Sequence, residues 1–86
     1  MPTVARIGAI QIRFYYEDHG IPHFHAISPN FDFKFAIVDG SIISGTGRIR
    51  GRELAVIRRW GQQHRDALFL NWQRARNAEP LQDIED

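Results

Sequence analysis

The spacing of apolar side chains changes near the middle of this chain, and that change limits which elements it can form. In residues 31–37 the side chains of Phe31, Phe33, Phe35 and Ile37 fall on alternate positions. A period of two is typical of a strand with one buried face. In the second half the apolar residues recur every three or four positions, which is typical of an amphipathic helix. The sequence therefore predicts strands first and helices last.

Turn residues divide the first half of the chain into short strands. We predict strands over residues 2–7, 10–17, 23–28, 31–37 and 41–44. Asp39 and Gly40 are a signal for a two-residue hairpin, and Gly20 can adopt the positive φ of a turn. Residues 45–47, Gly-Thr-Gly, are predicted to be a flexible run. Short connections between consecutive strands favour an antiparallel β-meander.

The helical spacing extends over residues 50–77. Its apolar seam consists of Leu54, Ile57, Gly61, His64, Leu68, Trp72 and Ala75. We expect the seam to pack on the phenylalanine face, as one long helix or as two divided near Gly61 or Asp66. Residues 78–86 form an acidic tail that we expect to be frayed or bound to a partner. The predicted fold is one α+β domain over residues 1–86, with strands over about 2–46.

The size and composition of the chain exclude several classes of protein. With 86 residues it has room for one small domain. It contains no cysteine, so disulfides and a thiolate nucleophile are excluded, and a reducing cytoplasm is the expected compartment. Apolar runs do not exceed four residues and the N-terminus has no signal-peptide core, so we expect no membrane role.

Basic residues concentrate in the helical region. Eight of the ten arginines lie in residues 48–76, against two acidic residues. On one continuous helix Arg58, Arg65 and Arg76 would share a flank, which can bind phosphate or an acidic partner. Val56 and Leu70 fall away from the apolar seam, and exposed apolar side chains favour a protein partner.

Three of the four histidines crowd into seven positions, at His19, His23 and His25. Residues two apart on a strand point to the same side, so His23 and His25 share a face. Because Phe24 fits the buried face, the imidazoles belong to the polar face. Their neighbours in a simple meander are Gln11, Arg13, Tyr15, Asp32 and Lys34. We therefore expect imidazoles, cations and a phenol on one solvent-exposed patch.

Such a patch can cleave RNA without a metal or another cofactor. One imidazole acts as base and one as acid near neutral pH, while a cation stabilises charge on phosphorus. The candidate catalytic residues are His23 and His25 as the acid–base pair, His19, Arg13 as phosphate clamp, and Tyr15 as proton donor or stacking platform. The candidate binding residues are Lys34, Tyr16, Arg58, Arg65 and Arg76.

Two other interpretations of the histidines stay open. A His-x-His pair on a strand can supply two ligands to a divalent metal, with Asp18, Glu17 or His19 as the third. Alternatively, the strand histidines only form hydrogen bonds with their neighbours. His64, on the helical seam, is predicted to be a core or interface histidine.

Four segments together resemble the bacterial domain-of-unknown-function family 4160. They are residues 1–3, 15–25, 60–65 and 71–81, and they include a Pro-His-Phe-His block and a Trp-x-x-Ala-Arg-Asn-x-Glu-Pro-Leu ending. The resemblance implies a small protein encoded beside a member of family 2442, the two being regarded as toxin and antitoxin of a type II pair. It implies no particular catalytic residues.

These observations lead to one hypothesis and two alternatives. The leading hypothesis is a cytoplasmic toxin that acts on RNA or the translation apparatus, is neutralised by a small antitoxin, and, if an enzyme, is a metal-independent endoribonuclease. The alternatives are a non-catalytic nucleic-acid- or protein-binding module and a His-x-His metal-dependent hydrolase.

Overall fold

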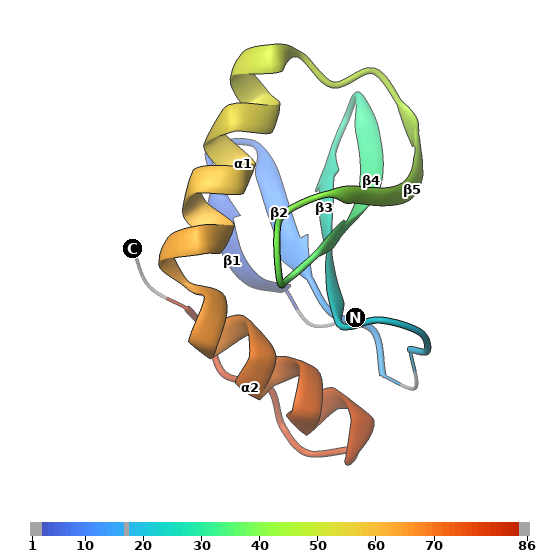
Figure 1. Cartoon of the computed structure of the whole chain (residues 1–86), viewed down its shortest axis with the longest axis vertical. Helices are drawn as coiled ribbons and strands as arrows, with labels where there is room; N and C mark the ends of the chain where they lie inside the picture. The colour runs from blue at the N-terminus through green and yellow to red at the C-terminus, as the bar shows by residue number, and fades with distance from the viewer. Residues whose placement is uncertain (1–2, 17, 85–86) are drawn as a thin grey trace.

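Five consecutive strands form one sheet in the computed structural model, which describes residues 3–16 and 18–84. The strands are β1 (Thr3–Ile7), β2 (Ile10–Arg13), β3 (His23–Ser28), β4 (Phe31–Ala36) and β5 (Ile42–Gly47). Each strand pairs antiparallel with the next, so the sheet order follows the chain (Figure 1). The predicted α+β meander is confirmed.

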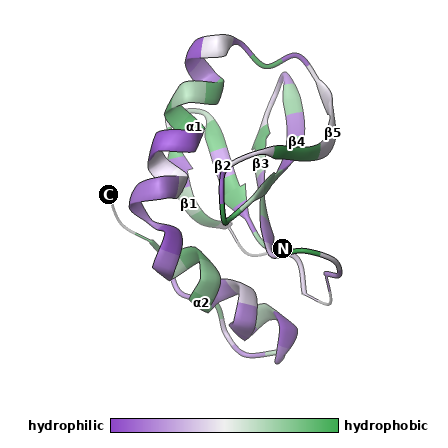
Figure 2. Cartoon of the chain, viewed as in Figure 1, coloured by the Kyte–Doolittle hydropathy of each residue, from purple (hydrophilic) through white to green (hydrophobic). Residues whose placement is uncertain are grey.

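Two helices complete the fold, α1 (Gly51–Gln63) and α2 (Arg65–Arg76). They are divided at His64, whose φ of −114° and ψ of 25° leave the helical region. The division therefore lies at neither Gly61 nor Asp66, the two positions considered from the sequence. Neither helix in the described part of the chain has the length and apolar composition needed to span a bilayer. In Figure 2, hydrophilic and hydrophobic segments alternate along α1, as they do in an amphipathic helix.

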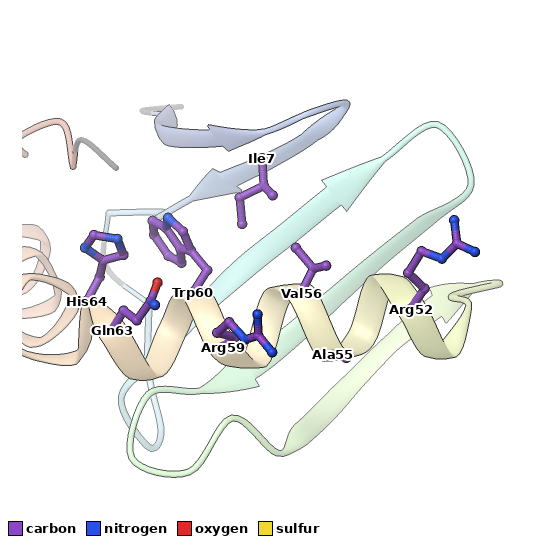
Figure 3. A pocket seen from close by; sticks show the side chains of 8 residues that line it. All are labelled: Ile7, Arg52, Ala55, Val56, Arg59, Trp60, Gln63 and His64. Atoms are coloured by element: carbon purple, nitrogen blue, oxygen red, sulfur yellow. The ribbon is translucent and has the colours of Figure 1, made fainter.

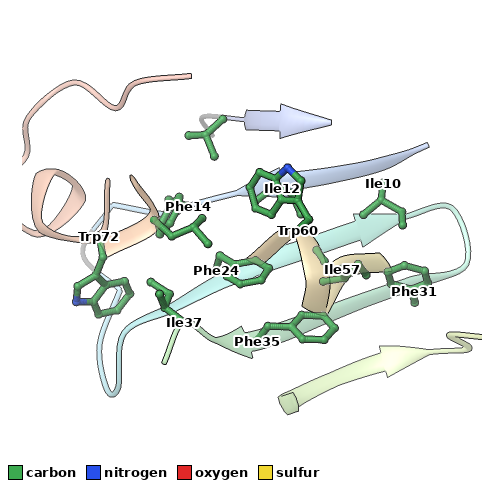
Figure 4. Packing of buried hydrophobic residues seen from close by; sticks show 13 residues of the cluster. Ile10, Ile12, Phe14, Phe24, Phe31, Phe35, Ile37, Ile57, Trp60 and Trp72 are labelled. Carbon is green, nitrogen blue, oxygen red and sulfur yellow. The ribbon is translucent and has the colours of Figure 1, made fainter. Parts of the chain in front are cut away.

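The hydrophobic core lies between one face of the sheet and the helices. Phe24 and Phe35 stack with ring centroids 5.6 Å apart, and Trp60 meets Phe24 edge-on at 6.2 Å. Figure 4 shows Ile57 and Trp60 of α1 against these strands. A Cβ at Gly61 would lie 3.4 Å from the Phe24 ring, which is an ordinary van der Waals contact, so α1 lies close against β3 at this glycine. Each buried side chain of this size contributes about 1.5–3 kcal/mol.

Two strands end at different residues from those predicted. β2 ends at Arg13, because the chain then folds back over β3. We expected this strand to continue through residue 17, which lies outside the described residues. β5 includes the run predicted to be flexible. Gly45 and Gly47 have φ values of 150° and 102°, and a Cβ at Gly45 would lie 2.3 Å from the carbonyl oxygen of Asp32. Glycine here permits pairing with β4 where a side chain would collide.

The connection between β4 and β5 is longer than the predicted two-residue hairpin. Ala36 donates its backbone N–H to the carbonyl of Ser41, and Gly40 donates to the carbonyl of Ala36, both at 2.8 Å. Gly40 has the positive φ expected of a turn glycine, 72°. The hairpin prediction placed the turn correctly but not its length.

Residues 79–84 run from the end of α2 to the edge strand β1. The buried Asn71 side chain donates to the carbonyl of Gln82 at 2.8 Å and accepts from its N–H at 3.0 Å. The N–H of Ile84 donates to the carbonyl of Val4 at 2.7 Å, at the outer edge of β1. The expectation of a frayed or partner-bound tail is therefore wrong for these residues, and the last two residues lie outside the described part.

Candidate functional site

The register of the sheet places a row of polar side chains across its five strands. Arg13 pairs with His25, and His25 pairs with Lys34. Thr3 pairs with Arg13 at one end, and Ser44 pairs with Lys34 at the other. We call these five residues the polar row. Those on β1 to β4 alternate with the core residues of their strands and so occupy the opposite face, and Ser44 joins them through its pairing with Lys34. The prediction that Arg13 and Lys34 flank a strand histidine is confirmed.

Asp18 joins the two strand histidines at one end of this face. The loop between β2 and β3 folds back so that Oδ2 of Asp18 lies 3.1 Å from Nε2 of His23 and 3.0 Å from Nε2 of His25. Nδ1 of His23 donates to the carbonyl oxygen of Ile21 at 2.8 Å. We call Asp18, His23 and His25 the Asp18 cluster.

Aromatic rings enclose the Asp18 cluster. Tyr15 meets His25 edge-on with ring centroids 4.3 Å apart, and Trp72 of α2 lies 4.9 Å from the His23 ring. His23 is 3% exposed and His25 is 7% exposed. The sequence predicted the correct face of the sheet for both histidines. The prediction that their imidazoles are exposed to solvent is wrong, because the folded-back loop and Trp72 cover them. Asp18, whose side chain is 22% exposed, connects the cluster to solvent.

The electrostatics of the cluster favour an ionised Asp18 and a neutral His25. Burial opposes ionisation of Asp18, but the hydrogen bond from His25 and the charges of both imidazoles outweigh it, so the pKa of Asp18 lies below 3.8. Burial also lowers the pKa of His25 below 6.5, with smaller contributions from His23 and Lys34, although Asp18 opposes the shift. The cluster thus combines a carboxylate with at least one neutral imidazole at neutral pH.

Neighbours hold the Arg13 guanidinium on the polar row. Its Nε donates to Oε1 of Gln11 at 2.9 Å and to Oγ1 of Thr3 at 3.2 Å, and Nη2 also donates to Gln11. These bonds fix the planar group beside the Asp18 cluster, where it can meet a phosphate or carboxylate.

Two of the predicted residues lie away from the cluster. His19 is exposed and belongs to no potential metal-ligating group among the described residues. Tyr16, 43% exposed, donates its hydroxyl proton to the carbonyl of Glu79 at 3.2 Å and so helps to hold the C-terminal segment. Glu17, one of the considered metal ligands, lies outside the described residues.

The three arginines predicted to share one flank line two different hollows. Arg58 and Arg65 line one hollow, where Nε of Arg58 donates to the carbonyl of Gly40 at 2.9 Å. Arg76 lines a different hollow beside Trp72. Arg58 therefore stabilises the loop between β4 and β5, and the flank of three arginines expected for a continuous helix does not form.

A groove of about 630 Å³ lies between α1 and β1. Figure 3 shows Ile7 of β1 opposite Val56 and Trp60 of α1, with Arg52 and Arg59 also lining the groove. Val56 is 41% exposed, which agrees with the sequence expectation that it leaves the apolar seam. At the end of the groove, His64 packs on Trp60 with ring centroids 4.8 Å apart and is half-buried, as predicted for a core or interface histidine.

Of the three acids and histidines considered from the sequence as a third ligand beside His23 and His25, Asp18 is the one that the structure places between both imidazoles. Two features of the site were missed from the sequence. They are the carbonyl of Ile21 as partner of His23 and the Trp72 ring over His23. Both depend on backbone direction and helix placement, which spacing does not encode.

Comparison with known proteins gives one match. The model of a family described as Domain of unknown function (DUF4160) matches residues 9–73. No curated protein and no solved structure matches the chain. The matched segment contains the Asp18 cluster and most of both helices.

Proposed function

We propose that this chain, which belongs to the DUF4160 family, is the toxin of a bacterial toxin–antitoxin pair and acts on RNA in the cytoplasm. The observation that carries the proposal is the in-register arrangement of Arg13, His25 and Lys34, which sets a cation on each side of an imidazole. The family resemblance supports the toxin role, and the arrangement of side chains supports RNA as the target.

The polar row suits a single-stranded RNA backbone. Arg13 and Lys34 lie on β2 and β4, two strand spacings or about 9.5 Å apart along the sheet. Each can contact a phosphate, and the ring of Tyr15 beside them offers an aromatic surface to a base. Two phosphate contacts predict a slope of about −1.4 for log K against log salt concentration.

RNA binding is tested with a fluorescent single-stranded oligonucleotide at several salt concentrations. We expect Lys34→Gln to weaken binding and to reduce the magnitude of the salt slope by about 0.7, because one phosphate contact is lost. The matched control is Arg65→Gln, which removes one charge from the helical side. Equal weakening by both substitutions would assign RNA binding to the helices or to net charge, and would contradict the proposal.

The biological role is tested by induced expression in a bacterial host, with and without the neighbouring gene. We expect growth to stop when this chain is expressed alone and to resume when both proteins are present. Lys34→Gln should reduce the inhibition at equal expression level. Growth unaffected by the chain alone would remove the toxin role.

A groove next to α1 suits the antitoxin. Its apolar residues, including Ile7 and Val56, adjoin the basic Arg52 and Arg59, a combination that fits an acidic segment with apolar side chains. We expect Val56→Asp to abolish co-purification with the product of the neighbouring gene. Leu70→Asp, at another exposed apolar residue, on α2, should leave co-purification intact. The opposite ranking would place the partner elsewhere.

A second candidate is an RNA-binding protein without turnover. It is favoured by the hydrogen bonds that occupy Nε2 of both His23 and His25, because a free base must reach the substrate proton. Incubation with cellular RNA, with and without chelator, separates the candidates. Cleavage that His25→Ala abolishes supports an enzyme, whereas salt-sensitive binding with intact RNA supports the binder.

A further inference from the structure

The Asp18 cluster presents three potential metal-ligating atoms to one point. Oδ2 of Asp18 and one ring nitrogen each of His23 and His25 all lie within 4.8 Å of one another. Two of the atoms come from alternate residues of β3, so the strand fixes their side and spacing. The third comes from the loop that folds over the strand.

The hydrogen bonds of His23 determine what its Nε2 atom presents to Asp18. A carbonyl oxygen only accepts, so Nδ1 of His23 must carry a hydrogen to bond Ile21 at 2.8 Å. If the ring is neutral, Nε2 then presents a lone pair, 3.1 Å from the carboxylate oxygen of Asp18. Two acceptors at this distance repel each other. Either a hydrogen or a metal ion must therefore lie between the two atoms.

The same bond to Ile21 is the usual support of a metal-ligating histidine. Such a ligand donates its other ring N–H to a backbone carbonyl or carboxylate, which fixes the tautomer and the ring orientation. His23 has this arrangement, and its ring is held further by Trp72, 4.9 Å away. The ring is thus oriented with Nε2 toward Asp18 before any ligand binds.

The distances fit a tetrahedral ion of the size of zinc. Metal–ligand bonds of 2.0–2.2 Å make the edge of a coordination tetrahedron about 3.3–3.5 Å long. The observed edges, Asp18 to His23 and Asp18 to His25, are 3.1 and 3.0 Å. Asp18 needs to move away from each imidazole nitrogen by only ~0.3 Å. The third edge joins the two imidazole nitrogens and lies within 4.8 Å, so the two rings turn toward each other when they bind one ion. Because Asp18 is 22% exposed, the fourth position can open toward solvent.

We infer that Asp18, His23 and His25 form a binding site for one divalent transition metal, with Zn²⁺ as the best match to two imidazoles and a carboxylate. Both nitrogens bind through their lone pairs, so His25 carries its hydrogen on Nδ1 when the ion is present. This inference goes beyond the proposed function, since it requires neither RNA nor an antitoxin.

The test is zinc binding by the purified full chain without a histidine tag, after removal of metals with a chelator. Calorimetry and competition with a chromophoric chelator give the stoichiometry and affinity. We expect one Zn²⁺ per chain, and a loss of at least 100-fold in affinity for His25→Ala. His19→Ala and His64→Ala, outside the cluster, should bind like wild type. No binding at 100 µM Zn²⁺, or equal affinity for His25→Ala, overturns the inference.

A second measurement covers the case in which His25→Ala does not fold. ¹⁵N NMR of the imidazoles in the wild-type chain reports directly which nitrogens bind the ion. We expect Nε2 of His23 and His25 to shift on zinc addition and the nitrogens of His19 and His64 to stay unchanged. Shifts confined to His19 or His64 overturn the site. RNA binding without zinc binding defeats this inference alone, and zinc binding without RNA binding defeats the proposed function alone.

Discussion

Replacing Asp18 by alanine tests the contacts on which the site depends. The substitution removes the oxygen that accepts hydrogen bonds from both His23 and His25. It leaves two nearly buried imidazoles without that partner, while the bond from His23 to Ile21 remains. We expect a large loss of stability without loss of the fold, since Asp18 lies on a loop and contributes no core packing.

The expected loss follows from the geometry. A hydrogen bond to a charged group contributes about 1.5–3 kcal/mol. Asp18 accepts two through a single oxygen, and its partial exposure lets solvent weaken both. We therefore expect the free energy of unfolding to fall by about 2–4 kcal/mol. For a domain of this size each kcal/mol lowers the Tm by about 4–8 °C.

The assay is urea unfolding at pH 7.5 in the presence of chelator, so that only the hydrogen bonds are measured. Asp32→Ala is the matched control, because Asp32 lies exposed on the same face and its removal should change stability by no more than about 0.5 kcal/mol. A loss below about 0.5 kcal/mol for Asp18→Ala would mean that the two hydrogen bonds do not hold the cluster together, and the reasoning would fail.

Three further predictions concern the backbone and the titration of the cluster. Gly45→Ala should destabilise the fold by about 2 kcal/mol or more, because the added Cβ meets the Asp32 backbone and φ is 150°. The control Gly51→Ala should not destabilise the fold, because its Cβ meets open space. The free energy of unfolding in denaturant tests both substitutions. Gly61→Ala should raise stability by up to about 1 kcal/mol, because alanine favours the helix and its Cβ contacts Phe24 at an ordinary distance of 3.4 Å; a lower Tm would show that α1 is displaced. The pKa of His25 in chelator should lie below 6.5, because its burial outweighs attraction to Asp18; His23 and Lys34 also face it. Its stabilising effect is then complete above pH 6.5 and is lost as the pH falls through the folded pKa, and an NMR midpoint above 6.5 would contradict this sign.

The sequence was informative wherever a local period decided the structure. Alternation in residues 31–37 and the parity of His23 and His25 were sufficient to place the phenylalanines in the core and the histidines on the polar face. The two-residue turn between β3 and β4 fixes Lys34 as a neighbour of His25, whereas Arg13 could be predicted there only from its parity on the preceding strand.

Features that depend on contacts between distant segments could not be predicted in this way. The helix break at His64 separates Arg76 from Arg58 and places Trp72 over His23. The C-terminal segment is held by the buried Asn71, which has no distinctive local pattern. For the same reason the sequence indicated histidines in open solvent, whereas tertiary packing covers them.

The most direct test of the functional surface is a titration of ¹⁵N-labelled protein with a single-stranded RNA oligonucleotide, followed through the backbone amides. The account predicts that the largest chemical-shift changes occur at Arg13, His25 and Lys34, with smaller changes along α1 and α2. Changes confined to the two helices, with the polar row unaffected at saturating RNA, would contradict it.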